Sequence, residues 1–245
     1  MNRLELFAVE GLPEVRPGDD LGDLISSEAQ LRPADVLVIA QKVVSKSEGR
    51  LRELASVVAG DEAKRIAPQL VANPDPRFVQ VVLDESVRVL RSQRVLITET
   101  RHGFVCANSG VDQSNISEPG VVSLLPDDPD ASAQRIRARI QERSGVAVGV
   151  IVSDTFGRPW RLGIVNVALG VAGLPALVDL RGTLDDAGRE LHATVLATAD
   201  DLASAAGLVM RKTARAPVVV IRGLELAGDG RGRELIRPAD EDVFR

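Results

Sequence analysis

Short runs of aliphatic residues, each followed by polar or helix-forming sequence, constrain the fold of this chain more than any other feature. Residues 35–45 (DVLVIAQKVVS), 146–152 (VAVGVIV) and 216–223 (APVVVIRG) predict strands buried in a dry interior. Strands that alternate with helical patterns predict an α/β (α+β) chain, and we expect a mixed β-sheet with flanking helices. The helical patterns cover residues 16–30, 61–72, 75–86, 132–145 and 199–210.

The remaining sequence predicts shorter elements and one further helix. Residues 164–175 (IVNVALGVAGLP) predict a tightly packed helix, because their glycines allow close approach of neighbouring segments. The Pro- and Asp-rich residues 123–134 and the charged tail from residue 227 are expected to be loops. Further strands are expected over residues 3–11, 176–182 and 189–198, with two more around a tight Arg-His-Gly turn in residues 94–110.

Composition limits the core and the classes of partner. The chain has 245 residues with five Phe, one Trp and no Tyr, so its core must be built from Val, Leu, Ile and Ala. Few aromatic residues argue against stacking on single-stranded nucleic acid, and the net charge of −5 disfavours broad binding to nucleic acid. We expect a single domain over residues 1–245, with two subdomains as the alternative.

The cysteine and the apolar stretches predict the compartment. Cys106 alone excludes an internal disulfide and fits a reducing cytosol, and its apolar context favours a core residue over a nucleophile. The N-terminus lacks the apolar segment of a signal peptide, and no window resembles a membrane span. We therefore expect a soluble, cytoplasmic protein with no membrane partner.

Polar residues follow two of the predicted strands. Asp154 and Thr155 end the strand from residue 146, where α/β proteins bind ligands, and they offer two oxygen ligands for Mg²⁺ or Mn²⁺. The alternative is that Asp154 caps the next turn. In CANSGVDQSN, Asp112 can supply a second carboxylate and Asn115 can contact a base or ribose, with a simple Asx-turn as the alternative.

Cationic residues follow strands as well. Lys42 and Lys46 suit phosphate oxygens, although lysines at a strand end are usually solvated. Arg158 and Arg161 flank the tryptophan and suit an anionic substrate, or form a packed surface turn. The sequence contains no Walker A motif, Rossmann glycine fingerprint, nucleophile elbow or zinc-like spacing. Together, acidic and cationic loops favour a metal-assisted reaction on a polyanionic nucleotide.

The sequence resembles the coenzyme F420:L-glutamate ligase family, also called F420-0:gamma-glutamyl ligase. The resemblance covers nearly the whole chain, in order, and its motifs taken together are highly specific. The matching stretches are VEGLPEVRPGDDLGDLI, DVLVIAQKVVSKSEGR, GFVCANSGVDQSNI, VGVIVSDTFGRPWRLGIVNVALGVAG, LVDLRGTLDDAGREL and VVVIRGL.

The resemblance implies GTP-dependent amide formation in coenzyme F420 biosynthesis. GTP would phosphorylate the terminal carboxylate of the deazaflavin precursor coenzyme F420-0, and the amine of L-glutamate would displace phosphate from the acyl phosphate. Later rounds would extend a γ-linked tail. The family implies two divalent ions, Mg²⁺ or Mn²⁺, and a monovalent cation such as K⁺ as a further ion.

The resemblance also implies roles for individual residues. Asp112, Asp154 and Thr155 match the metal ligands of the family, and Asp112, Asp154 and Lys46 would act in catalysis. Residues that match nucleotide contacts are Leu12, Pro13, Glu14, Val15, Gln41, Lys42, Lys46 and Asn115. The chain departs from the archaeal relatives at MRKTARAP, where Arg211, Lys212 and Arg215 replace a glycine- and acid-rich loop.

Two further expectations follow from the family. The resemblance implies an intertwined homodimer, so we expect this assembly. The chain is similar in length to the archaeal stand-alone enzyme and also to the N-terminal half of an actinobacterial bifunctional enzyme, whose FMN-binding nitroreductase-like domain is absent here.

Two alternative functions remain open. In one, the active site is the same but the acceptor or the amino acid differs. The other is a non-catalytic module that binds the deazaflavin or a nucleotide for a partner domain.

Overall fold

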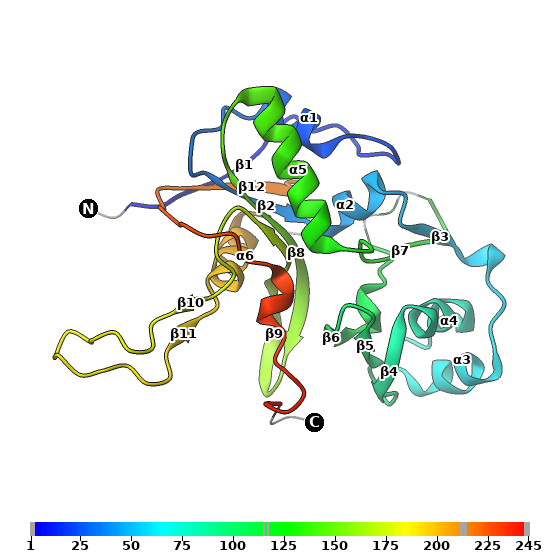
Figure 1. Ribbon diagram of the computed structural model, residues 1–245. Helices are drawn as coiled ribbons and strands as arrows, with labels where there is room; N and C mark the ends of the chain where they lie inside the picture. Colours follow the sequence, from blue (N-terminus) through cyan, green and yellow to red (C-terminus); the bar gives the residue numbers. More distant parts are fainter. Residues whose placement is uncertain (1–2, 115, 117, 211–214, 243–245) are drawn as a thin grey trace.

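A five-stranded mixed sheet lies at the centre of the protein (Figure 1). The structure is a computed structural model that describes residues 3–114, 116, 118–210 and 215–242. The strand order is β1-β12-β2-β8-β9; β2 and β8 are parallel and the other neighbours are antiparallel, which confirms the expected mixed α/β fold. The strands are β1 (Glu5–Ala8), β2 (Val36–Ala40), β8 (Gly149–Arg158), β9 (Arg161–Ala172) and β12 (Val218–Arg222).

Helices cover both faces of this sheet, so its central strands are buried on both sides. Along β2, Leu37 and Ile39 belong to the core on one face, whereas Val36 and Val38 belong to the core on the other. This alternation explains why every position of the strand is apolar. The first face packs against α1 (Leu21–Glu28) and α5 (Pro129–Ser144), and the second against α6 (Thr198–Met210).

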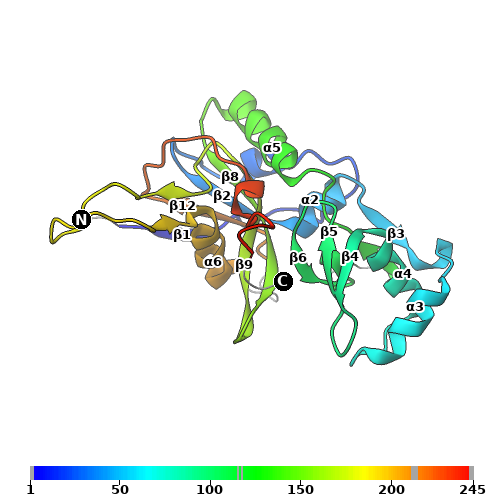
Figure 2. The same cartoon turned by 60° about the horizontal axis from the view of Figure 1, so that its bottom comes forward.

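A smaller half of the molecule is a single excursion of the chain between residues 51 and 123 (Figures 1 and 2). It has its own apolar core, which includes Ile66, Val81 and Val122. The chain leaves and returns through an antiparallel pair of strands in which Leu51 lies opposite Ser123. We call this excursion the small half and the rest the large half. Its elements are β3 (Leu51–Glu53), α3 (Asp61–Ile66), α4 (Pro76–Asp84), β4 (Ser86–Arg91), β5 (Ile97–Thr100), β6 (Val105–Ala107) and β7 (Val121–Ser123).

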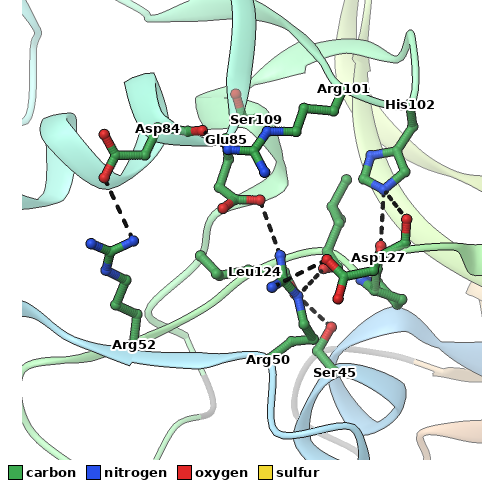
Figure 3. A network of polar contacts seen from close by, with 12 residues as sticks. Ser45, Arg50, Arg52, Asp84, Glu85, Arg101, His102, Ser109, Leu124 and Asp127 are labelled. Carbon is green, nitrogen blue, oxygen red and sulfur yellow. Dashed lines mark hydrogen bonds and ion pairs between the residues drawn. The ribbon is translucent and has the colours of Figure 1, made fainter.

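Polar contacts hold the two halves against each other (Figure 3). The Arg50 guanidinium lies 3.1 Å from Glu85 at the end of α4 and 3.2 Å from Asp127, and its Nε donates to the Leu125 carbonyl at 3.0 Å. His102, in the turn between β5 and β6, has its Nε2 at 2.9 Å from the Pro126 carbonyl oxygen, which requires a proton on Nε2. These contacts fix the small half relative to the segment that returns to the sheet.

Two segments extend beyond the packed body. An arm formed by residues 178–196 is held together by the short strands β10 (Val178–Asp179) and β11 (Val195–Leu196), and it projects outwards in both views (Figures 1 and 2). The tip of the β8–β9 hairpin exposes Trp160, Leu162 and Ile164. Among the described residues, no helix is long and apolar enough to cross a membrane.

The prediction of a helix over residues 164–175 is wrong, because most of this segment forms β9. It pairs with β8 from Val150 opposite Ala172 to Arg158 opposite Arg161. Its β-branched residues favour a strand. The glycines do permit close approach, as predicted, but to a different neighbour: a Cβ on Gly170 would lie 2.0 Å from the Pro129 carbonyl oxygen at the start of α5.

Several element boundaries also differ from the predictions. The strand from residue 146 does not end at residues 153–155, because β9 pairs with it as far as Arg158. The strand expected over residues 35–45 ends at Ala40, and α2 (Gln41–Ser47) begins there. Helix α5 begins at Pro129, inside the expected loop, since the Asp128 side chain caps it by accepting from the Ala131 amide. Strands expected over 176–182 and 189–198 shorten to β10 and β11. The 3₁₀ helices are Leu54–Ser56, Ala67–Gln69, Asn108–Gly110 and Gly232–Leu235.

Candidate active site

A cavity of about 990 Å³ is lined by both halves of the molecule. The large half contributes the loop before α1, helix α2 and the middle of β8, and the small half contributes the segment after β6. Asn115, Arg211 and Lys212 lie outside the described residues, whereas Arg215 lines the cavity. The predicted site residues that line it are Leu12, Pro13, Glu14, Val15, Gln41, Lys42, Lys46, Asp112, Asp154 and Thr155.

Lys42 and Asp112 form an ion pair between the two halves. Lys42 Nζ, on α2, lies 2.6 Å from Asp112 Oδ2 and also bonds to the Ser114 hydroxyl. The Ser114 amide donates to Asp112 Oδ1 at 2.7 Å. Burial raises the pKa of Asp112, but the hydrogen bonds and the charge of Lys42 outweigh it, so this pKa lies below the usual value for Asp. Asp112 is therefore a carboxylate at neutral pH.

A second lysine of α2 is paired in the same way. Lys46 Nζ lies 2.5 Å from Glu14 Oε1, and the Lys46 side chain is largely buried whereas that of Glu14 is exposed. Both cavity lysines of the described chain are thus neutralised by carboxylates of the same cavity. A phosphate group that enters can take over either ammonium, since it offers the same kind of acceptor oxygen.

Gln41 contributes to the site through its packing. Its Nε2 donates to the Ser45 hydroxyl at 2.5 Å and to the Leu124 carbonyl at 2.9 Å, so its amide anchors α2 to the chain that returns from the small half. Its Oε1 is buried and has no hydrogen-bond partner among the described residues. The sequence predicted Gln41 in the site but not this anchoring contact.

Strand β8 places Asp154 and Thr155 in the cavity from the middle of a paired strand rather than from its end. Thr155 lies opposite Asn166 of β9, and its hydroxyl donates to Asn166 Oδ1 at 3.4 Å. Asn166 also lines the cavity. Sequence reasoning missed Asn166 because its segment was assigned to a helix, and an Asn within an aliphatic run was the available signal.

Cys106, in the small half, lies close enough to Asp154 for their charges to interact. The thiol is buried on β6, and burial, followed by the negative charge of Asp154, raises the pKa of Cys106 to about 12, although a hydrogen bond involving the Gly110 backbone lowers it. The thiol is therefore protonated at neutral pH, which supports a core role over a nucleophilic one.

A left-handed turn leads from β6 to Asp112. Asn108, Ser109 and Gly110 have φ angles of 55°, 52° and 71°, and such a conformation is costly for residues other than glycine. Ser109 is buried, and its amide donates to Thr98 Oγ1 at 3.0 Å while the two hydroxyls lie 2.7 Å apart. Strained backbone that is held by such bonds is typical of functional sites.

Arg158 and Arg161 are not among the residues that line the cavity in the described chain. Arg158 instead donates to the Leu162 carbonyl at 2.7 Å across the β8–β9 turn. This contact lies in a surface turn, as in the alternative interpretation, but Trp160 and Leu162 of that turn are exposed rather than packed.

The donor set of the cavity suits a hard divalent cation. Within the described ranges, no group of three His, Cys, Asp or Glu side chains could hold a metal ion. The cavity does present the carboxylates of Glu14, Asp112 and Asp154 and the Thr155 hydroxyl, all hard oxygen donors. Mg²⁺ is commonly bound by one or two carboxylates and completes its shell with water and substrate phosphates, so these residues fit such an ion together with a phosphorylated ligand.

Comparison with known proteins gives a consistent result. A model of the F420-0:gamma-glutamyl ligase family matches residues 11–223. The chain is 46% identical over 255 residues to the coenzyme F420:L-glutamate ligase of Methanopyrus kandleri, with all of both chains covered. It is 45% identical to the protein of the same name from Archaeoglobus fulgidus, covering 99% of this chain and 97% of that one. For the Methanocaldococcus jannaschii protein of that name the identity is 44%, with coverage of 99% and 97%.

Proposed function

This chain belongs to the F420-0:gamma-glutamyl ligase family, and we propose that it joins L-glutamate to coenzyme F420-0 at the expense of GTP. The observation that carries the proposal is the cavity, in which both halves contribute carboxylates and α2 contributes two lysines. The lysines, and metal ions held by the carboxylates, would bind the phosphates of a nucleotide. The cavity is lined by both halves and would also hold the second substrate. Repetition of the reaction would extend the product by further γ-linked glutamates.

The reaction needs an activated carboxylate because a carboxylate is a poor electrophile. The γ-phosphoryl group of GTP moves to a carboxylate oxygen of F420-0, GDP leaves, and an acyl phosphate results. The glutamate amine then attacks the acyl carbon, inorganic phosphate leaves with the electrons of the C–O bond, and the amine loses a proton to a base. Divalent ions, when bound, supply neutralisation of the phosphate charge.

The residues of the chain have separate tasks in this proposal. Lys42 and Lys46 exchange their carboxylate partners for phosphate oxygens, which positions the nucleotide. Asp112, Asp154 and Thr155 would hold the ions, in the cavity that both halves line. The loop of residues 12–15 would shape the nucleotide pocket, and the guanidinium group of Arg215 adds a positive charge at the wall of the cavity.

We also propose that the enzyme acts as a homodimer. The arm of residues 178–196 exposes Leu184, Val195 and Leu196, and the β8–β9 tip exposes Trp160 and Leu162. Apolar side chains on two projecting segments are typical of surfaces that a second copy covers. Sedimentation of the purified chain measures this directly: a dimer mass supports the proposal, and a monomer mass at micromolar concentration contradicts it.

The test of the ligase proposal is mass spectrometry of the deazaflavin after incubation of the purified chain with GTP, L-glutamate, F420-0 and Mg²⁺ or Mn²⁺. We expect GTP-dependent mass gains in glutamate units and matching release of GDP. Asp154→Asn should abolish the gain, whereas Asp61→Asn, an exposed carboxylate on α3, should not. If the coenzyme stays bound without any mass gain, the chain is a binding module instead.

A further inference from the structure

Asn166 lies beside Thr155 at a wall of the cavity. The two residues are directly opposite each other in the β8–β9 register, so their side chains are on the same face of the hairpin. Both line the cavity. Asn166 is uncharged, so it cannot replace a carboxylate as a counterion for a divalent cation.

Contacts with α6 hold the Asn166 amide in a slot. The Ser204 hydroxyl donates to the Asn166 carbonyl oxygen of the main chain at 2.9 Å. The side-chain Nδ2 donates to Met210 Sδ at 3.4 Å, and a Cβ on Gly207 would lie only 3.2 to 3.5 Å from the amide atoms. Because Nδ2 donates to Met210, Oδ1 is the amide atom that accepts from Thr155.

The direction of this hydrogen bond matters for what Thr155 can bind. A hydroxyl has one proton and two lone pairs, and it can bind a cation only through a lone pair. Its proton must therefore point to another acceptor. Asn166 Oδ1 is that acceptor, so the Thr155 lone pairs are left for the cavity.

We propose that Asn166 is a positioning residue: it accepts the hydrogen bond of the Thr155 hydroxyl and thereby orients the lone pairs of that oxygen toward a divalent cation. The inference rests on the proposed function, in which Thr155 is a metal ligand. The separation of 3.4 Å is long for a hydrogen bond, and such bonds in ligand-free sites tighten when the ligand binds. Loss of a partner that orients a metal ligand typically costs about 10- to 100-fold in metal affinity.

The experiment is a Mn²⁺ titration of the full chain with GDP present, followed by electron paramagnetic resonance of unbound Mn²⁺, so that no turnover is needed. We expect Asn166→Ala and Thr155→Val each to weaken Mn²⁺ binding by about tenfold. The double variant should be no weaker than either single variant, because each removes the same oriented hydroxyl. Asn166→Asp keeps an acceptor oxygen and adds a negative charge, so it should bind Mn²⁺ at least as tightly as the native chain.

A second variant guards against a simple folding defect. Gly207→Ala leaves all polar groups in place but crowds the Asn166 amide from the opposite side, in a helix that favours alanine. It should weaken Mn²⁺ binding several-fold while a cooperative melting transition shows that the variant is folded. Unchanged affinity in both Asn166→Ala and Gly207→Ala overturns the inference.

Asp154→Asn separates the two proposals. If Mn²⁺ binding does not depend on Asp154, the ion site of the proposed function is wrong, and the inference falls with it. If binding depends on Asp154 but the effects of Asn166→Ala and Thr155→Val multiply to about 100-fold, the ion site stands and the inference alone is overturned.

Discussion

At the scale of single residues, both lysines of the cavity in the described part of the chain already have carboxylate partners before any ligand enters. Lys42 is held by Asp112 and Lys46 by Glu14, and both pairs are partly open to solvent. The lysine side chains are only 20% and 13% exposed, so an ammonium group left without a partner would be costly. A phosphate oxygen that replaces a carboxylate partner, as in the proposed function, would keep each ammonium group paired throughout.

Cys106 provides a prediction that depends on pH. Because its pKa is raised to about 12 in the folded chain, the thiol stays protonated well above the pH at which an unfolded cysteine ionises, about 8.5. Ionisation therefore favours the unfolded state as the pH rises through about 8.5, and its effect becomes negligible below about pH 7.5. We expect stability to fall with a slope of at most about 1.4 kcal/mol per pH unit from this residue, and Cys106→Ala should remove that part.

Urea unfolding of both proteins from about pH 8 to 11 measures this slope. The chain has no tyrosine, so fewer groups titrate in the same range. Iodoacetamide gives an independent check, since the folded thiol should react at about pH 8 only after unfolding. Rapid alkylation of the folded chain contradicts a protonated, buried Cys106.

Which site residues the sequence could predict depended on where they stand relative to apolar runs. Asp154, Thr155 and Lys42 follow such runs, so their polarity was conspicuous and their shared cavity could be expected. Asn166 sits within a run, and only the pairing with β8 brings it to Thr155. Roles for Asp112, Asp154 and Thr155 came from the family resemblance, and they stay predictions.

At the scale of elements, the β8–β9 hairpin carries the site and depends on glycine at one point of contact. Gly170 faces the start of α5 so closely that a Cβ would lie 2.0 Å from a backbone oxygen. Gly157, on the partner strand, would meet no atom within 4 Å. Neither residue has a positive φ, so only packing distinguishes the two positions.

We therefore expect Gly170→Ala to destabilise the protein on the order of 3 kcal/mol, because α5 must move away from the sheet. Gly157→Ala should change stability by less than about 0.5 kcal/mol. Urea unfolding midpoints of the two variants measure the difference. Equal midpoints would mean that α5 adjusts freely and that its packing on β9 is not tight.

The elements themselves were predictable where period and punctuation agreed. Helix α5 ends at Ser144, and Gly145 caps it in the left-handed conformation, as the sequence indicates. Strand β12 coincides with its aliphatic run. Segment 164–175 was misassigned because its glycines were interpreted as close-packing positions of a helix, although its β-branched residues favour a strand. The pairing with β8 fixes the length and register of β9, and no local pattern indicates that long-range partner.

At the scale of the whole molecule, the cavity depends on how the two halves are held together. Arg50 contacts Glu85 in the small half and both Asp127 and the Leu125 carbonyl in the large half (Figure 3). Its side chain and that of Glu85 are mostly buried, at 22% and 12% exposed. The neighbouring Arg52 is more exposed and lies 3.6 Å from Asp84.

Arg50→Met should therefore loosen the contact between the halves, at a cost of about 1.5 to 3 kcal/mol. It should also weaken the proposed binding of GTP several-fold, although it leaves the lysines of the cavity in place. Arg52→Met is the matched control, with an expected loss below about 1 kcal/mol. Isothermal titration of GTP and limited proteolysis report the two effects. If both variants bind GTP like the native chain, the Arg50 contacts do not set the geometry of the cavity.

The ends of the excursion that forms the small half are hydrogen-bonded neighbours, Leu51 opposite Ser123. A segment that begins and ends at one place is a detachable cassette, since a tight turn could join its two ends without displacing β2 or β8. The cavity draws Asp112 from this cassette and Asp154 from the permanent scaffold. Exchange of the cassette alone would alter what the cavity accepts, while β8 keeps its carboxylate and hydroxyl in place.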